Sequence, residues 1–327
     1  MNVEKETGNH FKHEQELKTF DDAAVLWMKS KKNRVKESTF AVYYLAVQSH
    51  LLPKLGHLKL DEITEEGVNE YLDDLMNRDR LRGEGGLSWK TVSDIRSILR
   101  MILETASRNG YPHLGAIQLA LPPTKPSSMQ VLTREEQSQL VSYLMEHLIP
   151  MNLGILLSLF SGLRIGEVCG LRWGDIDFHY GTLRVSRTVI RYTDVSGDGT
   201  KKTKLMVTDP KTVNSLRTIP IPSDILALLE PFRRDPECYL ISGTKQLVEP
   251  RRLLGRFKTV LREAGIPDFR FHALRHSFAT RCVEEEFDIK SLSEILGHSS
   301  VKITMDRYVH PSMDFKKQQM DRLTLPT

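Results

Sequence analysis

The stretch FHALRHSFAT, from Phe271 to Thr280, places three basic side chains within five positions of a segment with helical character. Residues three or four positions apart lie on the same face of a helix, so His272 shares a face with both Arg275 and His276. Three interpretations follow. His272 and His276 could bind a metal ion at i, i+4 spacing, His272 and Arg275 could converge on an anion such as a phosphate, or the group could be a hydrogen-bonded structural patch.

The composition is that of a globular protein with room for two domains. The chain has 327 residues, of which 40% are hydrophobic and 27% are charged, and each of two domains of this size can bury a core. Cys169, Cys238 and Cys282 show no C-x-x-C spacing, so neither a disulfide framework nor a zinc knuckle is predicted. No apolar run has the length of a membrane span, and the N-terminus lacks the apolar core of a signal peptide. We therefore expect a cytoplasmic protein that does not enter a membrane.

The formal net charge of +4 is unevenly distributed along the chain. Residues 1–121 carry 17 basic and 18 acidic residues, whereas residues 122–327 carry 29 and 24. The clusters KSKKNRVK, KKTK and PRRLLGRFK are candidates for contact with nucleic acid, although each also fits a solvated surface. The candidate DNA-binding residues in these clusters are Lys29, Lys31, Lys32, Arg34, Lys36, Lys201, Lys202, Lys204, Arg251 and Arg252.

Helical patterns dominate residues 20–121. The segment STFAVYYLAVQSHLLPKLG opens with a cap signal and carries apolar residues at helical spacing, and Pro53 and Gly56 are expected to end its helix. TEEGVNEYLDDLMN has a candidate cap at Thr64, and SWKTVSDIRSILRMILETASRNG predicts a longer amphipathic helix that ends at Gly110. Strand signals are scarce here, so this part of the chain is predicted to be helical.

A change in pattern marks a second domain. LPPTKPSSMQV has three prolines and no periodicity, which indicates an extended linker at residues 122–131. Beyond it, Thr133 and Glu136 have capping-box spacing, and MNLGILLSLFSG predicts a buried helix. GTLRVSRTVI, KLMVTD and LRTIPI predict β-strands, and helical patterns continue from SDILALLEPF to about Tyr308. The glycine-rich SGDGTK lacks the full spacing of a phosphate-binding loop and indicates a β-hairpin loop.

Four motifs occur in order in the second domain: SGLRIGEVCGLRWGDID, DPKTVNSLRTIPI, FHALRHSFAT and LGHSSVKITMDRYVH. Together they resemble the tyrosine recombinase, or phage integrase, family. The resemblance implies a mainly α fold with a small antiparallel β-sheet, in which a helical core-site DNA-binding domain at residues 20–121 and a mixed α/β catalytic domain at residues 132–310 clamp duplex DNA. Residues 1–19 would be an N-terminal lead-in, and residues 311–327 a C-terminal tail that is a candidate for docking on another protomer.

The resemblance assigns roles to residues by their position in these motifs. Arg164 in GLRIGE becomes the first catalytic arginine, and Glu167 becomes its supporting carboxylate. Lys211 in DPKT becomes the β-hairpin lysine, and His272 with Arg275 becomes the H-x-x-R pair. His276 is left to pack or hydrogen-bond behind the site.

Two more catalytic residues lie near the C-terminal end of the domain. By the same resemblance, His298 stands where the family uses His or Trp, and Tyr308 is the nucleophile. These residue types suit cleavage of a phosphodiester, because two arginine side chains can bind the negative charge that develops on the non-bridging oxygens. A tyrosine nucleophile needs a base to take its proton, since a pKa near 10 leaves about one side chain in a thousand ionised at neutral pH. His272 could accept or share the Tyr308 proton, and Lys211 is a candidate general acid for the leaving 5′ oxygen.

The function implied by the resemblance is site-specific recombination of a mobile DNA element through a 3′-phosphotyrosyl intermediate. The energy of the cleaved bond stays in the protein–DNA link, so no cofactor is expected. No metal is expected either, because no third ligand pattern accompanies His272 and His276. The implied partners are double-stranded DNA and further copies in a homotetramer on synapsed DNA, with room for an accessory directionality protein. Two alternatives remain, namely a DNA-binding regulator on the same fold and a topoisomerase-like enzyme that cleaves and religates without synapsis.

Overall fold

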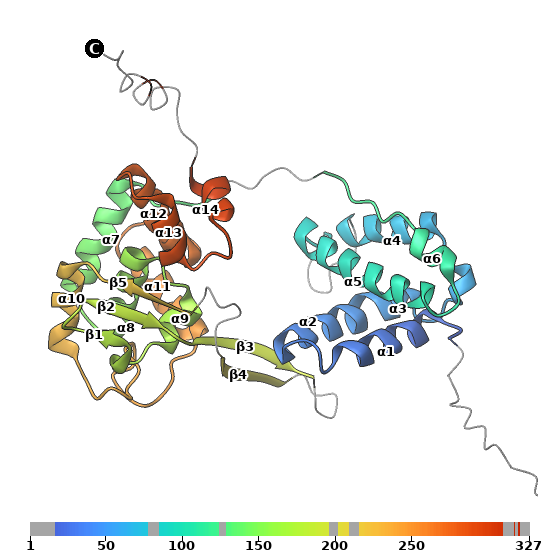
Figure 1. The fold of residues 1–327 in the computed structure, drawn as a ribbon, viewed down its shortest axis with the longest axis horizontal. Helices are drawn as coiled ribbons and strands as arrows, with labels where there is room; N and C mark the ends of the chain where they lie inside the picture. The colour runs from blue at the N-terminus through green and yellow to red at the C-terminus, as the bar shows by residue number, and fades with distance from the viewer. Residues whose placement is uncertain are drawn as a thin grey trace, which may run out of the picture. The chain divides into compact units, whose positions relative to one another are not determined.

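The computed structural model describes residues 17–77, 85–123, 129–195, 202–208 and 216–309, together with Lys317 and Met320. The chain divides into two compact units, and Figure 1 shows the helices and strands of each. The first unit comprises Met1–Pro126 and Thr193–Lys202, and the second comprises Ser127–Tyr192 and Thr203–Thr327. The predicted fold class, mainly α with a small antiparallel sheet, is confirmed. The domain boundaries at 20–121, 122–131 and 132–310 stay a prediction.

Capping residues set the start of the main helices of the first unit. Thr19, Thr64 and Ser88 each accept a backbone N–H from the first turn of the helix that follows, which satisfies donors that a helix leaves unpaired. The cap predicted at Thr64 is therefore confirmed. The elements of this unit are α1 (Phe20–Lys31), α2 (Glu37–Ala46), a π-helical turn (Val47–Leu51), α3 (Leu52–Leu55), a 3-10 turn (Leu60–Glu62), α4 (Glu65–Asn77), α5 (Trp89–Ser107) and α6 (Pro112–Ala116).

The prediction that Pro53 ends the helix beginning near Glu37 was wrong. The helical path continues through the π-helical turn into α3, and Pro53 lies in the first turn of that helix. A π turn shifts the register of the backbone hydrogen bonds, so a proline just beyond it need not break the path. Gly56 caps the C-terminal end of α3 as expected. The predicted end of α5 was three residues too late, because the helix stops at Ser107.

The core of the first unit forms around α5, the longest helix that the structure describes. It contacts α1, α2, α4 and α6. Its buried residues Val92, Ile95, Leu99 and Ile102 recur every three or four positions, and Trp27 of α1 is buried in the same cluster. Each large apolar side chain buried in this way contributes about 1.5–3 kcal/mol. The unit therefore has a hydrophobic core of its own.

The second unit is built around α8 (Pro150–Ser161), an apolar helix that is buried as the sequence predicts. α8 contacts α7, α9, α10, α11 and α12, so it touches most helices of this unit (Figure 1). The capping box between Thr133 and Glu136 is present and starts α7. The other helices of this unit are α7 (Arg134–Glu146), α9 (Ile165–Gly170), α10 (Ser223–Leu229), α11 (Pro250–Glu263), α12 (His272–Glu284), α13 (Ile289–Leu296) and α14 (Val301–Tyr308).

The described strands form two small sheets. A three-stranded sheet has the order β1–β2–β5 with antiparallel pairs, in which Leu183 stands opposite Ile176 on one side and Ile219 on the other. A separate two-stranded sheet pairs β3 with β4. Arg217 begins β5, and this strand contacts α13. The strands are β1 (Ile176–Asp177), β2 (Thr182–Val185), β3 (Thr188–Asp194), β4 (Lys202–Thr208) and β5 (Arg217–Pro220).

Gly162 fixes the place where α8, α12 and α13 meet. It caps α8 with φ 66° and ψ 20°, which is the left-handed region. A Cβ at this position would lie 2.7 Å from Cδ1 of Phe278 on α12 and 2.8 Å from Cδ2 of Leu296 on α13. Glycine is therefore required twice, for the backbone conformation and for the close approach of two helices.

Replacing Gly162 by alanine should lower the free energy of unfolding by about 2 kcal/mol or more, because overpacking adds to about 1 kcal/mol of left-handed strain. Gly243→Ala is the matched control, since Gly243 also has φ 66° but no heavy atom within 4 Å of the Cβ position. That control should lose only about 1 kcal/mol. Urea unfolding followed by circular dichroism measures both, and equal losses would contradict the packing argument.

Candidate active site

Arg275 is a buried cation at the centre of the candidate site. It lies one turn into α12 and exposes only 1% of its surface. Its Nη1 donates to the carbonyl of Gly162 over 2.8 Å, and its Nη2 donates to the carbonyl of Leu296 over 2.7 Å. These carbonyls lie at the C-terminal ends of α8 and α13, where the helix dipole favours a cation. Burial lowers the pKa of Arg275 to about 9, which leaves the guanidinium charged at neutral pH.

A second cationic group forms around Glu167 in α9. Nη1 of Arg164 lies 2.8 Å from Oε1 of Glu167, and the backbone N–H of Arg164 donates to Oε2 over 3.0 Å. Arg217 donates to the same carboxylate with both terminal nitrogens, over 3.2 and 3.0 Å. Its Nε donates to the carbonyl of Ile295 at the end of α13 over 2.7 Å. Arg217 thus ties the start of β5 to α9 and α13.

The two arginines around Glu167 differ in how far they reach solvent. The side chain of Arg164 is 38% exposed, whereas those of Arg217 and Glu167 are 6% and 5% exposed. Burial alone would raise the pKa of Glu167, but the hydrogen bonds and charges of Arg217 and Arg164 lower it below its ordinary value. Glu167 is therefore an ionised support, and Arg164 is the member of the group that can meet a ligand.

Two histidines of α12 meet edge to face. The rings of His272 and His276 have centroids 4.5 Å apart and an interplanar angle of 84°. Burial of each ring, together with repulsion from nearby cations including Arg275, lowers both pKa values to about 4. His272 nevertheless keeps exposed surface. Both rings are neutral at pH 7, so each offers one nitrogen as a hydrogen-bond acceptor.

Tyr308 ends α14 and turns its hydroxyl into this group. It is 7% exposed, and its Oη lies 2.8 Å from Nδ1 of His276. Its ring lies nearly parallel to that of His298, with centroids 6.4 Å apart. Burial raises the pKa of Tyr308 above its ordinary value, while the charges of Arg275 and Arg307 act to lower it. The tyrosine is thus protonated at neutral pH, in a cationic environment that favours its ionised form.

His298 is held from behind by a buried hydroxyl. The residue is 9% exposed, and its Nδ1 lies 2.8 Å from Oγ1 of Thr304 in α14. Burial, together with the charges of Arg275 and Arg164, lowers the pKa of His298 to about 4. The structure thus brings together the six predicted site residues that it describes, namely Arg164, Glu167, His272, Arg275, His298 and Tyr308.

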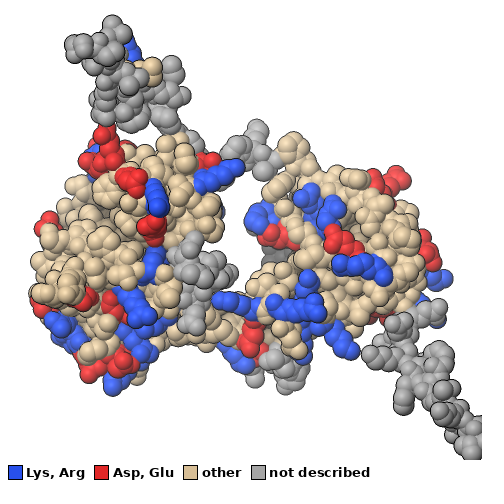
Figure 2. Space-filling model, viewed as in Figure 1, with Lys and Arg blue, Asp and Glu red and all other residues tan. Residues whose placement is uncertain are grey.

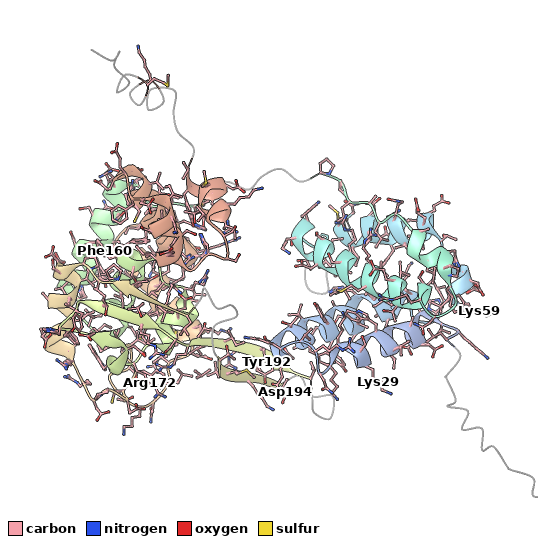
Figure 3. All side chains as sticks on the ribbon, in the orientation of Figure 1. Lys29, Lys59, Phe160, Arg172, Tyr192 and Asp194 are labelled. Carbon is pink, nitrogen blue, oxygen red and sulfur yellow. The ribbon has the colours of Figure 1, made fainter. Side chains whose placement is uncertain are left out.

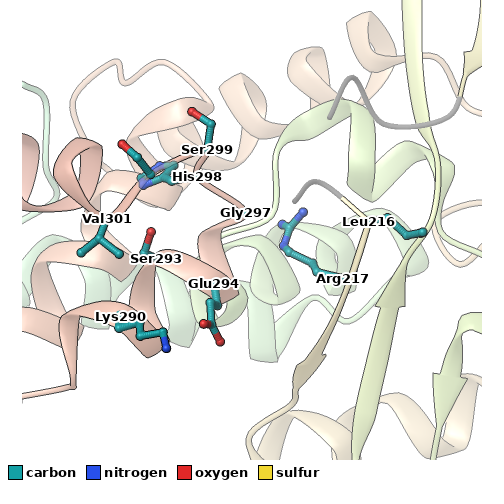
Figure 4. Close-up of a pocket in the computed structure, with 10 residues that line it drawn as sticks. Leu216, Arg217, Lys290, Ser293, Glu294, Gly297, His298, Ser299 and Val301 are labelled. Carbon is teal, nitrogen blue, oxygen red and sulfur yellow. The ribbon is translucent and has the colours of Figure 1, made fainter. Parts of the chain in front are cut away.

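An open pocket of about 500 Å³ adjoins this cluster. It lies between α13, the loop before α14 and the start of β5. Figure 4 shows the Arg217 side chain directed from β5 toward the loop that carries Gly297 and His298, with Lys290 and Glu294 on the wall formed by α13. Solvent therefore reaches the edge of the cluster from this side.

Several predicted features fall outside the described residues. They are the β-hairpin lysine Lys211, the SGDGTK loop with Lys201, and most of the tail after Val309. The strand that carries Lys202 is described, but not the position of this side chain. The roles given to these residues stay predictions.

The other candidate DNA-binding residues lie at three places. Lys29 and Lys31 are on α1, and Lys32, Arg34 and Lys36 connect α1 to α2. Figure 2 shows basic side chains gathered over this end of the first unit, and Figure 3 marks Lys29. The remaining three are exposed residues of the second unit, namely Lys204 on β4 and both Arg251 and Arg252 in the first turn of α11. These positions suit contact with a polyanion.

Two residues of the cluster were not assigned a role in the chemistry from the sequence. Arg217 lies inside the motif DPKTVNSLRTIPI, yet an arginine before a short strand resembles any surface arginine. His276 was expected to pack or hydrogen-bond behind the site, whereas its Nδ1 contacts the Tyr308 hydroxyl itself. The i, i+4 spacing of the two histidines placed His276 on the correct face, but nothing in the sequence shows which ring α14 reaches.

Within the described ranges, no three or more His, Cys, Asp or Glu residues are grouped so that they could hold a metal ion. Burial raises the pKa values of the Cys169 and Cys282 thiols to about 12, so these thiols are poor nucleophiles at neutral pH. In the part of the chain that the structure describes, no helix combines the length and apolar character needed to cross a membrane.

Comparison with known proteins places both units in one family. A model of the phage integrase family matches residues 130–314, and a model of the phage integrase N-terminal SAM-like domain matches residues 19–76. The chain is 30% identical over 301 residues to a tyrosine recombinase XerC-like protein of Caldanaerobacter subterraneus subsp. tengcongensis, which covers 84% of this chain and 74% of the relative.

Solved structures share the fold. The Tn1549 transposon integrase in complex with a circular intermediate DNA matches with a TM-score of 0.70 at 22% identity, over 94% of this chain and 100% of that chain. A lambda integrase tetramer bound to a Holliday junction matches with a TM-score of 0.60 at 19% identity, over 90% of this chain and 79% of that chain.

The neutral histidines predict a specific pH dependence of stability. His272, His276 and His298 have folded-state pKa values of about 4, below the ordinary 6.5, so the unfolded chain binds more protons between these values. Stability should therefore fall as the pH is lowered from about 6.5 toward 4. The contribution of Glu167 is lost only below its ordinary value of 4.5.

His298→Asn should make the urea midpoint fall less between about pH 7 and pH 5, because one proton-linked group is removed. The Asn side chain can still accept the Thr304 hydroxyl. His179→Asn, at an exposed position of the same unit, is the matched control. An unchanged pH dependence in His298→Asn would show that this ring does not resist protonation in the folded protein.

Proposed function

Because the chain belongs to the phage integrase family, we propose that it is a site-specific DNA recombinase that cleaves and rejoins DNA through a covalent 3′-phosphotyrosyl intermediate. The observation that carries the proposal is the placement of Tyr308. The residue is buried, its hydroxyl contacts His276, its ring lies parallel to that of His298, and the charges of Arg275, Arg307 and Arg164 act on it. A tyrosine in such a place suits attack on a phosphate more than a structural role.

Each arginine has a part in binding the scissile phosphate. Arg164 is the exposed fork, and Glu167 holds it in position. Arg275 forms the floor of the site, where two helix ends fix its guanidinium. Charge that grows on the non-bridging oxygens meets cations already in place, so little reorganisation is needed in the transition state. Losing one such donor typically lowers a rate by about two to three powers of ten.

The chemical step joins the Tyr308 oxygen to phosphorus and breaks the bond to the 5′ oxygen. Tyr308 gives up its proton to a neighbouring base, and the 5′ oxygen takes a proton from a general acid, for which we propose Lys211. His272 and His298 then bind the phosphate oxygens. Attack by a 5′ hydroxyl of a second strand reverses the step, so no nucleotide cofactor is consumed.

Similar proteins of known structure support a proposal for the substrate and the assembly. The Tn1549 integrase was solved with a circular intermediate DNA, and lambda integrase as a tetramer on a Holliday junction. We propose that duplex DNA is the substrate here and that four protomers assemble on two synapsed duplexes. Residues 20–121 would read the core site together with the basic residues of α1, β4 and α11. Residues 311–327 would dock on a neighbouring protomer, and an accessory directionality protein would bias the reaction.

Tyr308→Phe removes one hydroxyl, so it should abolish covalent attachment to DNA while sequence-specific binding stays nearly unchanged. The measurement is trapping of covalent complex on a nicked suicide duplex, with a gel-shift assay as the binding control. Covalent complex formed by this variant would show that another residue attacks.

The same substrates separate the two alternative functions. A binding-only regulator would give no covalent complex with the wild-type chain. A topoisomerase-like enzyme would give covalent complex with single duplexes but no recombinant product from pairs. Recombinant product from paired duplexes is the outcome that we expect.

Cleavage should persist in excess EDTA, because the cations at the phosphate are side chains. The test is the rate of covalent complex formation before and after chelation. Loss of activity that zinc or manganese restores would instead support a metal site at His272 and His276.

A further inference from the structure

Of the two histidines of α12, His276 and not the first histidine of the H-x-x-R motif is hydrogen-bonded to the Tyr308 hydroxyl in the described part of the chain. Oη lies 2.8 Å from Nδ1 of His276, and the two rings have centroids 5.8 Å apart with an interplanar angle of 49°. Tyr308 is 7% exposed, so water has little access to satisfy this hydroxyl. The contact joins α12 to the end of α14.

The surroundings of His276 leave its ring neutral and able to accept a proton. Among the residues that the structure describes, the charged and titratable groups that face it are His272 and Arg275 of α12 and Arg307 and Tyr308 of α14. No carboxylate is among these groups. The neutral ring therefore carries its proton on Nε2 when Nδ1 accepts the Tyr308 hydroxyl.

His272 is less suited to the same task. It begins α12 and meets His276 edge to face, and it keeps exposed surface. The structure gives no hydrogen bond from Tyr308 to this ring among the described residues, whereas it gives one to His276. The two histidines can thus have separate roles, in which His272 binds the phosphate and His276 contacts the hydroxyl of the nucleophile.

We propose that His276 is a catalytic residue whose Nδ1 accepts the hydroxyl proton as Tyr308 attacks the scissile phosphate. The inference rests on the proposed function, in which Tyr308 is the nucleophile. The Tyr308 oxygen bonds to phosphorus, its proton moves to His276, and the 5′ oxygen departs with a proton from the general acid, for which Lys211 is proposed. In the reverse step the His276 imidazolium returns the proton to Tyr308.

The arrival of the phosphate makes this transfer easier than it is in the free protein. Repulsion by Arg307 and Arg275 contributes to the low pKa of His276. A phosphate anion offsets this repulsion and raises the pKa of the ring, because an opposite charge favours the protonated form. The base therefore gains strength when the substrate is in place.

The alternative is that His276 only orients the hydroxyl, and an asparagine separates the two roles. The amide oxygen of Asn can stand near the position of Nδ1 and accept a hydrogen bond, but it cannot take a proton at neutral pH. His276→Ala removes both capacities. His147→Ala is the matched control, since the ring of His147 also contacts a tyrosine ring, that of Tyr143, with centroids 4.3 Å apart.

The experiment measures single-turnover formation of covalent complex by the full chain on a nicked suicide duplex that carries the recombination junction. His276→Ala and His276→Asn should both cleave about 100-fold or more slowly, in line with the loss of a general base. His147→Ala should cleave at the wild-type rate. Cleavage by His276→Asn within about threefold of wild type would overturn proton transfer and leave an orienting role.

A second substrate tests where the proton goes. A duplex with sulfur in place of the bridging 5′ oxygen has a leaving group that needs no proton, because a thiol has a much lower pKa than an alcohol. It should restore cleavage by Lys211→Ala but leave the defect of both His276 variants. If this substrate restored cleavage by the His276 variants, His276 would act as the proton donor to the leaving group, and the inference would be overturned.

Failure of the inference is distinguishable from failure of the proposed function. If the wild-type chain forms no covalent complex, or Tyr308→Phe still forms one, the proposed function fails. If both behave as proposed and the His276 variants cleave like wild type, only the role of His276 is lost.

Discussion

The buried guanidinium of Arg275 is the interaction on which the candidate site depends. A cation placed in a protein interior costs several kcal/mol unless it is paired or hydrogen-bonded. Arg275 meets this cost through the carbonyls of Gly162 and Leu296, which end α8 and α13. The same bonds hold three helices at one point, and the left-handed conformation of Gly162 allows them to approach. The hydrogen bonds that fix the guanidinium of Arg275 therefore also hold the helices of the domain together.

The charge of Arg275 influences the protonation states of the groups around it. Arg164 and Arg217 share the carboxylate of Glu167, which stays ionised. Burial and these cations together keep the neighbouring histidines neutral. The free protein thus holds a cationic site with neutral bases and a protonated tyrosine. In the proposed function, a phosphate group of DNA is the anion that these cations attract, and its charge would raise the pKa values of the neighbouring histidines.

The helices could be predicted because they depend on patterns that a chain displays locally, whereas most residues of the cluster were assigned through the resemblance of four motifs to a known family. Capping residues such as Thr133 and the apolar run of α8 mark helices without reference to the rest of the fold. The roles of Arg217 and His276 could not be found in this way. Each depends on a partner far along the chain, Glu167 for the first and Tyr308 for the second. The path through Pro53 was missed because a π-helical turn leaves no clear mark in the sequence.

The central claim is that Tyr308 in this cluster is the nucleophile whose oxygen bonds to DNA. The most direct measurement is to trap the covalent complex, digest the DNA and then the protein with trypsin, and locate the attached nucleotide by mass spectrometry. Trypsin cleaves after Arg307, so the account predicts a 3′-phosphonucleotide on the peptide that begins with Tyr308. A nucleotide on any other residue, or attachment through a 5′ phosphate, would contradict it.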